Sequence, residues 1–587
     1  MRRHPIRKFL GLTVLYAALI VGIFVLQFKT ESVINRVFGD LRITLAQTQG
    51  DQNLRKLKNQ FQVSYRGLNL LASDASPVKA FNSASPDAVM DLVLDNFTET
   101  KNSLQLNFAG GSSITFSLSE EGEGGTLNVF ASVGAGLDTI SVPYRNASTH
   151  TVEELSTGRV ILNSKEALLS LTAAEVDSER IYFTTDNPVA SYGLYDPSRK
   201  FEFVAVAGMP MTDVQAYNTS VKQFRDTLVT RFSQVAGGNQ ADDLTEKDVV
   251  AFVAEMASRN QYNEGLDLVP DSFKRSNRRT YVSAPYFDNL VNMDKTLSLE
   301  LERFNSMVQT AISSGNLDIY TVDGITDYML REKNTGTVLS ILGLLGILEE
   351  TEPTVTQAIG ILSVYGNMLS KDKEISARLM PALPYCISVL EDNAVLENGN
   401  LHITEKDVFI TVEQNVILGT ALISIGSQTG HNEYVEAGRL LVNQQLVYTS
   451  SMNLSALSAL YPLLLPNNTF YPHTVVMGYY GSSPVWAWTC ANSVKYTIAS
   501  NGVVSLNIDF PLENTHYMII KGVPNFNSTI EIQQMMFRTD PRFETYNSSG
   551  YVYSESEKTL FLKSRHKSKN ELIRLWCSPV SNFVPKS

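Results

Sequence analysis

One short segment holds most of the residues that could do chemistry. It runs from residue 470 to 488 and contains Tyr471, His473, Trp486 and Trp488. Because residues i and i+2 of a strand lie on one face, Trp486 and Trp488 would form a single aromatic shelf. Such a shelf suits the flat C–H face of a sugar ring, and a nearby tyrosine and histidine suit its hydroxyls. Tyr471, Trp486 and Trp488 are therefore candidate ligand-binding residues, and His473 is a candidate catalytic residue.

Glu413 is the second candidate catalytic residue. It lies in an apolar helical stretch, where burial would raise the pKa of its carboxyl group and suit it to general acid catalysis. Each of these candidates has a structural alternative. The two indoles could seal an interface between domains, and His473 and Glu413 could serve packing alone. A basic run at residues 274–279 could hold an anionic polymer or could be an exposed loop.

The motifs of the common enzyme classes are missing. The chain contains no GxSxG, GxxxxGK[ST], HExxH or GxGxxG pattern. Its three cysteines, Cys386, Cys490 and Cys577, are widely separated and form no CxxC or Cys/His spacing. The sequence therefore predicts no metal and no cofactor, and it does not name a reaction.

Length and composition define the broad class. At about 150 residues per domain, 587 residues predict about three to four domains. A hydrophobic fraction of 43% is that of a globular chain rather than a disordered one. The net charge of -12 argues against a nucleic-acid binder, which needs a basic face to displace counterions.

The N-terminus predicts the location. Residues 10–28 carry no charge and are just long enough to cross a bilayer core of about 30 Å. Arg2, Arg3, Arg7 and Lys8 precede them, and positive charge stays on the cytoplasmic side. A cleaved signal peptide is the alternative, but its apolar region is usually about 7–15 residues. We therefore expect residues 1–37 to be a cytoplasmic tip and an uncleaved signal anchor in the cell membrane, with the bulk of the chain in a periplasm-like space.

The hydrophobic pattern then changes twice along the chain. Over residues 38–208 it has a period of two, which predicts an antiparallel β-sandwich. Gly110-Gly111 is typical of a tight hairpin. The predicted strands are Leu41–Gln47, Gln60–Leu71, Ser103–Phe108, Ser113–Leu118, Thr126–Val133, Thr139–Tyr144, Arg180–Thr184 and Phe201–Val206.

Residues 209–470 have helical periodicity and predict an array of antiparallel helical hairpins. Capping boxes begin at Thr245, Thr354 and Thr404. The stretch 338–348 is apolar nearly all round and predicts a fully buried helix. Glycines here would let neighbouring helices approach closely; they are Gly343 and Gly346, then Gly360 and Gly366.

Residues 471–587 return to a period of two and predict a small C-terminal β domain, with a basic hairpin tip at 563–569. The expected fold is thus multidomain α+β: a transmembrane helix, a β-sandwich, a helical array and a C-terminal β domain.

This order of domains resembles that of carbohydrate-active proteins with an α/α toroid, in which six helical hairpins are flanked by β-sandwich domains. The stretch 412–443, which contains LGTALISIGSQTGHNEYVEAGRLLV, is similar to one hairpin of such a toroid. The resemblance implies an envelope-anchored protein that binds a polysaccharide, and it leaves open whether the protein cleaves it as a glycoside hydrolase or lyase. It assigns no catalytic residue. Two alternatives remain: a non-enzymatic envelope scaffold, and a carrier of lipid or lipopolysaccharide with an apolar groove inside the sandwich.

Overall fold

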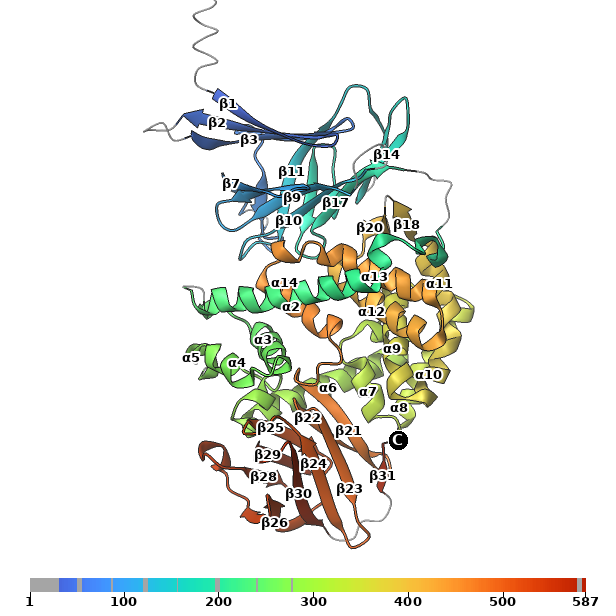
Figure 1. Cartoon of the computed structure of the whole chain (residues 1–587). Coiled ribbons are helices and arrows are strands. Elements are labelled where there is room, and N and C mark those ends of the chain that lie inside the picture. Colours follow the sequence, from blue (N-terminus) through green and yellow to red (C-terminus); the bar gives the residue numbers. More distant parts are fainter. Residues whose placement is uncertain are drawn as a thin grey trace, which may run out of the picture. The chain divides into compact units, whose positions relative to one another are not determined.

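The computed structural model describes residues 31–49, 55–85, 88–119, 125–155, 157–195, 201–238, 241–275, 278–397, 399–577 and 583–586. It is a multidomain α+β structure with antiparallel sheets and a helical region (Figure 1). The chain forms two compact units, residues 1–200 with 395–412 and residues 201–394 with 413–587. The predicted anchor at 10–28 lies outside the described residues. Among the residues that are described, no helix is long and apolar enough to cross a membrane.

Two antiparallel sheets build the first unit. In one sheet the strand order is β1 (Glu31–Phe38), β2 (Leu41–Gln49), β3 (Arg55–Tyr65), β4 (Leu68–Ala72), β11 (Thr139–Asn146), β16 (Arg180–Thr184) and β15 (Glu175–Val176), with β5 (Lys79–Phe81) beside β11 and β6 (Met90–Asp91) beside β5. In the other it is β12 (Thr151–Leu155), β13 (Arg159–Asn163), β14 (Leu168–Thr172), β17 (Val189–Leu194), β10 (Leu127–Ser132), β9 (Ser113–Leu118), β8 (Ser103–Phe108) and β7 (Leu94–Glu99).

Aromatic side chains from both sheets meet in one core. Phe61 of β3 and Phe116 of β9 have ring centroids 6.3 Å apart, and so do Tyr65 of β3 and Tyr192 of β17. The inward-facing residues of both sheets belong to the same buried cluster. The two sheets therefore pack face to face in the manner of a β-sandwich, with the space between them filled by side chains.

Most of the predicted strands are present; Gln60–Leu71 is two strands, β3 and β4, joined by a turn at Arg66 and Gly67, and one predicted strand is wrong. Gly110 and Gly111 have φ angles of +90° and +84° and connect β8 to β9, as the hairpin prediction required. The predicted strand Phe201–Val206 instead contains a 3-10 helix, η2 (Phe203–Val206). Its two buried residues, Phe203 and Val206, are three positions apart, which is one turn of a 3-10 helix.

A hairpin from the middle of the chain completes the first unit. Thr404, predicted to cap a helix, lies instead in β19 (Asn400–Glu405), which pairs with β18 (Ala394–Glu397) and β20 (Val408–Phe409). Lys406 and Asp407 have φ angles of 53° and 63° and form the two-residue turn between β19 and β20. The amide of Val412 donates to the carbonyl of Asp186 at 3.0 Å, within the first unit.

Two helices of the second unit, α3 (Glu246–Ser258) and α9 (Val355–Lys371), begin at predicted capping boxes. The capping boxes at Thr245 and Thr354 are both present. The helices are α2 (Val214–Ala236), α3 (Glu246–Ser258), α4 (Tyr262–Leu268), α5 (Asp271–Lys274), α6 (Leu290–Ser314), α7 (Ile325–Arg331), α8 (Gly336–Gly343), α9 (Val355–Lys371), α10 (Lys373–Leu379), α11 (Leu383–Asp392), α12 (Val412–Thr429), α13 (Asn432–Leu446) and α14 (Leu454–Leu464).

Only one of the two glycine predictions is confirmed. A Cβ atom at Gly360 would lie 2.7 Å from the carbonyl oxygen of Tyr320, so a close approach does occur there. At Gly343 and Gly346 a Cβ atom would meet nothing within 4 Å. The stretch 338–348 is not one buried helix but α8 followed by the 3-10 helix η7 (Leu344–Glu349), and its apolar side chains are exposed in part, Leu339 by 53%.

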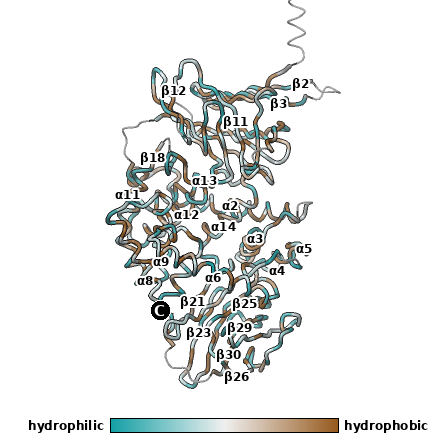
Figure 2. Tube along the Cα trace, turned by 180° about the vertical axis from the view of Figure 1, so that it is seen from behind, coloured by the Kyte–Doolittle hydropathy of each residue, from teal (hydrophilic) through white to brown (hydrophobic). Residues whose placement is uncertain are grey.

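The second unit ends in two further antiparallel sheets. One has the order β28 (Gly550–Ser554), β29 (Thr559–Arg565), β25 (Thr515–Lys521), β22 (Ser483–Thr489), β21 (His473–Tyr480) and β31 (Phe583–Pro585). The other has the order β23 (Ser493–Ile498), β24 (Val503–Asp509), β30 (Asn570–Cys577), β26 (Phe526–Ile532) and β27 (Met535–Arg538). Buried side chains alternate with more exposed ones along β23 and β30, and Figure 2 shows the hydropathy along the trace of these sheets.

The basic run at 563–569 is not a hairpin tip. It connects β29 of one sheet to β30 of the other. Lys563 is buried and its ammonium group donates to the carbonyl of Glu544 at 2.9 Å, and His566 is buried as well. Lys563 and His566 therefore contribute to packing at a crossover between sheets, whereas Arg565, Lys567 and Lys569 are exposed.

Candidate functional site

A polar groove with a volume of about 510 Å³ lies along one face of α2. Ser450, from the 3-10 helix η9 (Thr449–Ser451), also contributes to it. The α2 residues that line the groove recur every three to four positions and so share one helix face. They are Thr219, Lys222, Gln223, Asp226, Thr227, Thr230, Arg231 and Gln234.

The sequence of α2 explains why this face is polar. Asp213 caps the helix by accepting hydrogen bonds from the amides of Gln215 and Ala216. Phe224, Leu228 and Phe232 recur every four residues and are fully buried, so they fix which side of the helix packs. The groove residues lie on the other side, which is left to solvent.

The hydroxyl groups of the groove threonines already donate hydrogen bonds to the backbone of α2. The hydroxyls of Thr219, Thr227 and Thr230 each donate to the backbone carbonyl four residues earlier, at 2.8, 2.8 and 2.9 Å. A hydroxyl whose proton is used in this way still offers its oxygen as an acceptor. The groove therefore presents acceptors along the helix, with the amide groups of Gln223 and Gln234 beside them.

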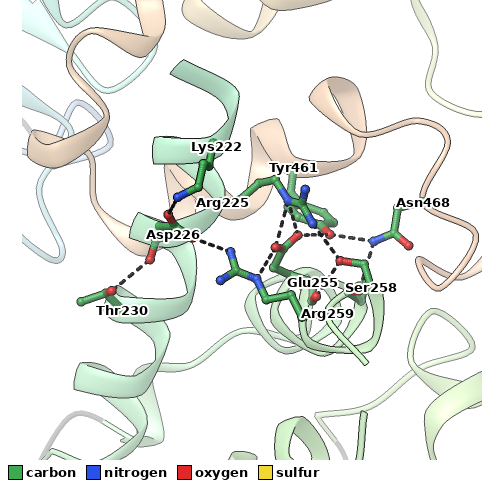
Figure 3. A network of polar contacts seen from close by, with 10 residues as sticks. Lys222, Arg225, Asp226, Thr230, Glu255, Ser258, Arg259, Tyr461 and Asn468 are labelled. Carbon is green, nitrogen blue, oxygen red and sulfur yellow. Dashed lines mark hydrogen bonds and ion pairs between the residues drawn. The ribbon is translucent and has the colours of Figure 1, made fainter. Parts of the chain in front are cut away.

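A network of charged side chains links Lys222 and Asp226 of the groove to α3 (Figure 3). Lys222 Nζ lies 2.7 Å from Asp226 Oδ2. Arg259 Nη2 of α3 lies 2.9 Å from the other carboxylate oxygen of Asp226, and its Nε lies 2.6 Å from Glu255 Oε1. One guanidinium group therefore bridges a carboxylate in the groove and a carboxylate beneath it.

Glu255 is the centre of this network and is 0% exposed. Arg225 Nε donates to both of its oxygens, at 2.9 and 3.0 Å, and the hydroxyl of Tyr461 of α14 donates at 2.8 Å. Asn468 Nδ2 in turn donates to the Tyr461 hydroxyl at 2.7 Å. These bonds join α2, α3 and α14, so they fix the groove in position.

The electrostatics of the groove favour an ionised Asp226. The hydrogen bond from Lys222 lowers the pKa of this carboxyl group, and the bond from Arg259 lowers it further against the effect of burial. A glycosidase acid needs a raised pKa so that it still carries its proton at neutral pH. Asp226 is therefore an acceptor and an ionic contact rather than a proton donor.

The two tryptophans of the predicted shelf lie on one face of β22, opposite Val476 and Thr474 of β21. Protein groups contact both. The guanidinium of Arg331 lies 4.9 Å from the ring centroid of Trp486, which is buried. Trp488 Nε1 donates to the carbonyl of Tyr281 at 2.6 Å, and their rings lie edge to face at 5.4 Å.

Tyr471 and His473 lie where β21 begins. His473 Nδ1 donates to the carbonyl of Tyr471 at 2.9 Å, and burial lowers the pKa of this imidazole. Burial also raises the pKa of Tyr471 to about 12, and the ring centroid of Tyr471 lies 6.1 Å from that of Tyr461. The structure thus brings the four predicted residues of this segment onto two neighbouring strands and the turn before them.

Glu413 comes from a different element, the first turn of α12. Its side chain is exposed, so the burial on which the general-acid prediction depended is not found at this residue. The basic run at 274–279 is packed in part. Arg279 lies 5.2 Å from the ring centroid of Phe287, and the guanidinium of Arg278 donates to the carbonyl of Leu244.

Sequence reasoning missed Glu255, although a signal was present. Glu255 stands alone among apolar residues in the stretch 249–257, and Arg259 follows it by one helical turn. The same reasoning selected Glu413 instead. The partners that complete the site, Arg225 and Tyr461, come from other helices, and no spacing in the sequence links them to Glu255.

No metal cluster accompanies these charges: within the described ranges, no three histidine, cysteine, aspartate or glutamate side chains are grouped to hold an ion. No known protein-family model matches the chain, and no curated protein matches it. The site therefore has to be interpreted from its own geometry.

Proposed function

We propose that the chain is a membrane-tethered, extracytoplasmic protein that binds a polysaccharide along the α2 groove without cleaving it there. The tether and the location are inferred from residues 1–28, with their basic tip and uncharged apolar segment. The single observation that carries the binding proposal is the groove itself, whose carboxylate, Asp226, is held through Arg259 to the buried Glu255.

The groups in the groove suit sugar hydroxyls. A sugar ring carries adjacent hydroxyls that both donate and accept, and planar amides and carboxylates pair with them well. Gln223, Gln234 and Asp226 supply these groups along one helix face. Because Glu255 holds Arg259 and Arg259 in turn holds Asp226, the carboxylate of the groove needs little ordering when a ligand binds.

The arrangement of carboxyl groups supports polysaccharide binding better than polysaccharide cleavage. Glycosidases need two carboxyl groups that flank the scissile bond, one of them protonated. Here Asp226 is held ionised, and Glu255 lies fully buried beneath two guanidinium groups. Neither carboxyl group is available as a general acid, which favours a binding role.

The proposed arrangement of the helices is that of hairpins in a toroid-like array. The pair α12 and α13 supports it, because the two helices approach closely at glycines on both. A Cβ atom at Gly438 would lie 2.4 Å from the carbonyl oxygen of Gly419, and one at Gly426 would lie 2.8 Å from a methyl group of Val435. These contacts run in opposite chain directions, as in an antiparallel hairpin.

The other two hypotheses have less to support them. A lipid carrier would need an apolar groove between the sheets of the first unit, where the aromatic core packs. An interaction scaffold would use the same groove for an extended polypeptide, so it shares the site and differs in the ligand.

The test is binding of the purified full-length protein to insoluble envelope polysaccharides, followed by competition with soluble fragments. Changing Gln223 and Gln234 to alanine should weaken retention at least about tenfold, since each lost pair of good hydrogen bonds is worth about 1 kcal/mol or more. Asn218→Ala is the matched control, because Asn218 is exposed on α2 but lies outside the groove.

One further variant tests whether the tryptophan segment, residues 471–488, is the site. His473→Gln roughly preserves side-chain size and should leave retention unchanged if the groove binds the ligand. Lost retention in His473→Gln with normal retention in the glutamine double variant would transfer the site to the segment 471–488. Retention of a polypeptide and of no polysaccharide would support the scaffold hypothesis instead.

A further inference from the structure

We propose that the outer face of the layer formed by β1, β2 and β3 is a docking surface for anionic lipid headgroups, an inference that rests on the proposed membrane tether. We call this surface the outer face. Figure 1 shows these three strands as one layer of the first unit. The surface would hold the first unit flat on the membrane to which residues 10–28 attach it.

The alternation of side chains defines the outer face. Leu41, Ile43 and Leu45 of β2 are fully buried, so the core side of the layer is fixed. The residues between them point the other way. On β1 this exposed side carries Val33 and Val37, which are 58% and 63% exposed. Two large β-branched side chains therefore stand in solvent on an edge strand of the sheet.

Cations accompany these valines. Arg42 lies directly across from Val37 in the β1–β2 register, and Lys56 lies across from Thr48 in the β2–β3 register. Both side chains are exposed. The strands β1, β2 and β3 contain five arginine or lysine residues and one carboxylate, Glu31; the cations are Arg36, which pairs with Glu99, and Arg42, Arg55, Lys56 and Lys58. A protein with an overall charge of -12 has thus gathered positive charge on one layer.

The short connection between the apolar segment and β1 indicates that these cations lie near the membrane. The apolar segment ends at Phe28, and β1 begins three residues later at Glu31. Three residues span at most about 10 Å. A tether in the bilayer therefore holds the start of β1 at the membrane surface. The register places Thr48 beside Glu31 and Lys56 beside Thr48, so the cations of β3 share that end of the layer.

The cations and the exposed valines of the outer face both favour anionic lipid as the ligand. Basic residues next to a membrane anchor are attracted to anionic lipids, at about fivefold in affinity per cation. Exposed apolar side chains beside them can enter the boundary between headgroups and acyl chains. A second protein would account for the valines, but it would not account for their position on a strand that begins three residues after the apolar segment.

The native cysteines make a direct measurement possible. Cys386, Cys490 and Cys577 are all buried, so an introduced surface cysteine can be labelled selectively. Asn35→Cys places a dye between Val33 and Val37 on the outer face without removing either. Thr98→Cys is the matched control, because Thr98 is exposed on β7, an edge strand of the opposite sheet.

The full-length protein is reconstituted into vesicles of equimolar phosphatidylglycerol and phosphatidylcholine, with a spin label on a fraction of the headgroups. The dye at position 35 should be quenched severalfold more than the dye at position 98. This difference should shrink in pure phosphatidylcholine. Equal quenching at the two positions in protein that floats with the vesicles overturns the docking surface and leaves the tether intact.

Two sets of variants then separate the contributions. Arg42→Gln with Lys56→Gln should weaken the quenching advantage about fivefold per cation. Val33→Thr with Val37→Thr keeps β-branched residues on the strand and should also reduce it. Val152→Thr, an exposed valine of β12, is the control and should have no effect.

Protein that does not float with the vesicles overturns the tether and the docking surface together. A dye at position 35 that is shielded but not quenched overturns lipid docking in favour of a protein partner.

Discussion

Glu255 is the residue on which the groove depends most. It is fully buried and accepts hydrogen bonds from Arg225, Arg259 and Tyr461. Glu255→Gln replaces one acceptor oxygen with an amide that faces guanidinium donors, so we expect a loss of about 3–5 kcal/mol in the free energy of unfolding. Urea denaturation followed by tryptophan fluorescence measures it, since all three tryptophans lie in the same unit.

Asp226→Asn is the control for this prediction. The Asp226 side chain is 46% exposed, and its pairs with Lys222 and Arg259 are screened by solvent, so the expected loss is about 0–1 kcal/mol. Similar losses in the two variants would show that the buried network does not anchor the groove.

His516 predicts how stability depends on pH. It is fully buried, its ring stacks on Phe510 at 4.3 Å, and neither ring nitrogen has a hydrogen-bond partner within the described part of the chain. Burial and the neighbouring His566 hold the pKa of His516 well below its usual value. The unfolded chain, with a histidine pKa of about 6.5, therefore binds a proton that the folded chain does not.

The contribution of His516 to stability should consequently be complete above about pH 6.5 and fall by up to about 1.4 kcal/mol per pH unit below it. Melting temperatures from pH 7 to pH 5 would show this. His516→Phe keeps a ring over Phe510 and should reduce the slope. An unchanged slope in His516→Phe would mean that other groups cause the acid sensitivity.

Residue types predicted part of the site and could not predict the rest. A period of two correctly placed Trp486 and Trp488 on one face of a strand. Their contacts with Arg331 and Tyr281 lie more than 150 positions away in the chain, and no local pattern encodes them. Glu255 had a local signal in Arg259 one turn later, but its other partners, Arg225 and Tyr461, come from two other helices and no local pattern links them to it.

At the scale of elements, one local signature gave two different structures. Thr245 and Thr404 begin near-identical stretches, yet the first caps α3 and the second lies in β19. The residues that follow decide the outcome. After Thr245 an apolar helical run is buried on nearly all sides, whereas Thr404 is followed by a turn with positive φ at Lys406 and Asp407 and then by β-branched residues. Capping signals therefore predict a helix start only together with the periodicity beyond them.

The helix glycines give a prediction with its own control. Gly360→Ala would place a Cβ atom 2.7 Å from the Tyr320 carbonyl oxygen, so α9 must shift, and we expect a loss of about 1–3 kcal/mol. Gly343→Ala meets open space in α8 and should be neutral or stabilise by up to about 1 kcal/mol, because alanine favours the helix. Urea denaturation of both variants measures the difference. Equal losses would mean that backbone conformation, rather than packing, sets the effect.

At the scale of the whole molecule, the first unit is discontinuous in sequence. Its sheets come from the N-terminal third of the chain, and residues 395–412 return to it from between α11 and α12. No pattern in the sequence predicted this return, because the hairpin interrupts a helical region and its start resembles a helix cap. The two units consequently have separate cores joined by more than one chain crossing, and each should have its own stability.

Gly158→Ala tests whether residues 395–412 stabilise the first unit separately from the second. Gly158 precedes β13, and a Cβ atom there would lie 2.4 Å from the carbonyl oxygen of Asp407, in the turn between β19 and β20. The hairpin must move away, so the free energy of unfolding of the first unit should fall by about 1–3 kcal/mol.

Hydrogen exchange in rising urea should show faster exchange of β13, β14 and β19. Tryptophan fluorescence reports only the second unit, where Trp486, Trp488 and Trp576 all lie, so its transition should stay unchanged. A shift of the fluorescence transition together with the exchange transition would show that the units unfold as one, and an unchanged exchange pattern would show that residues 395–412 do not stabilise the first unit.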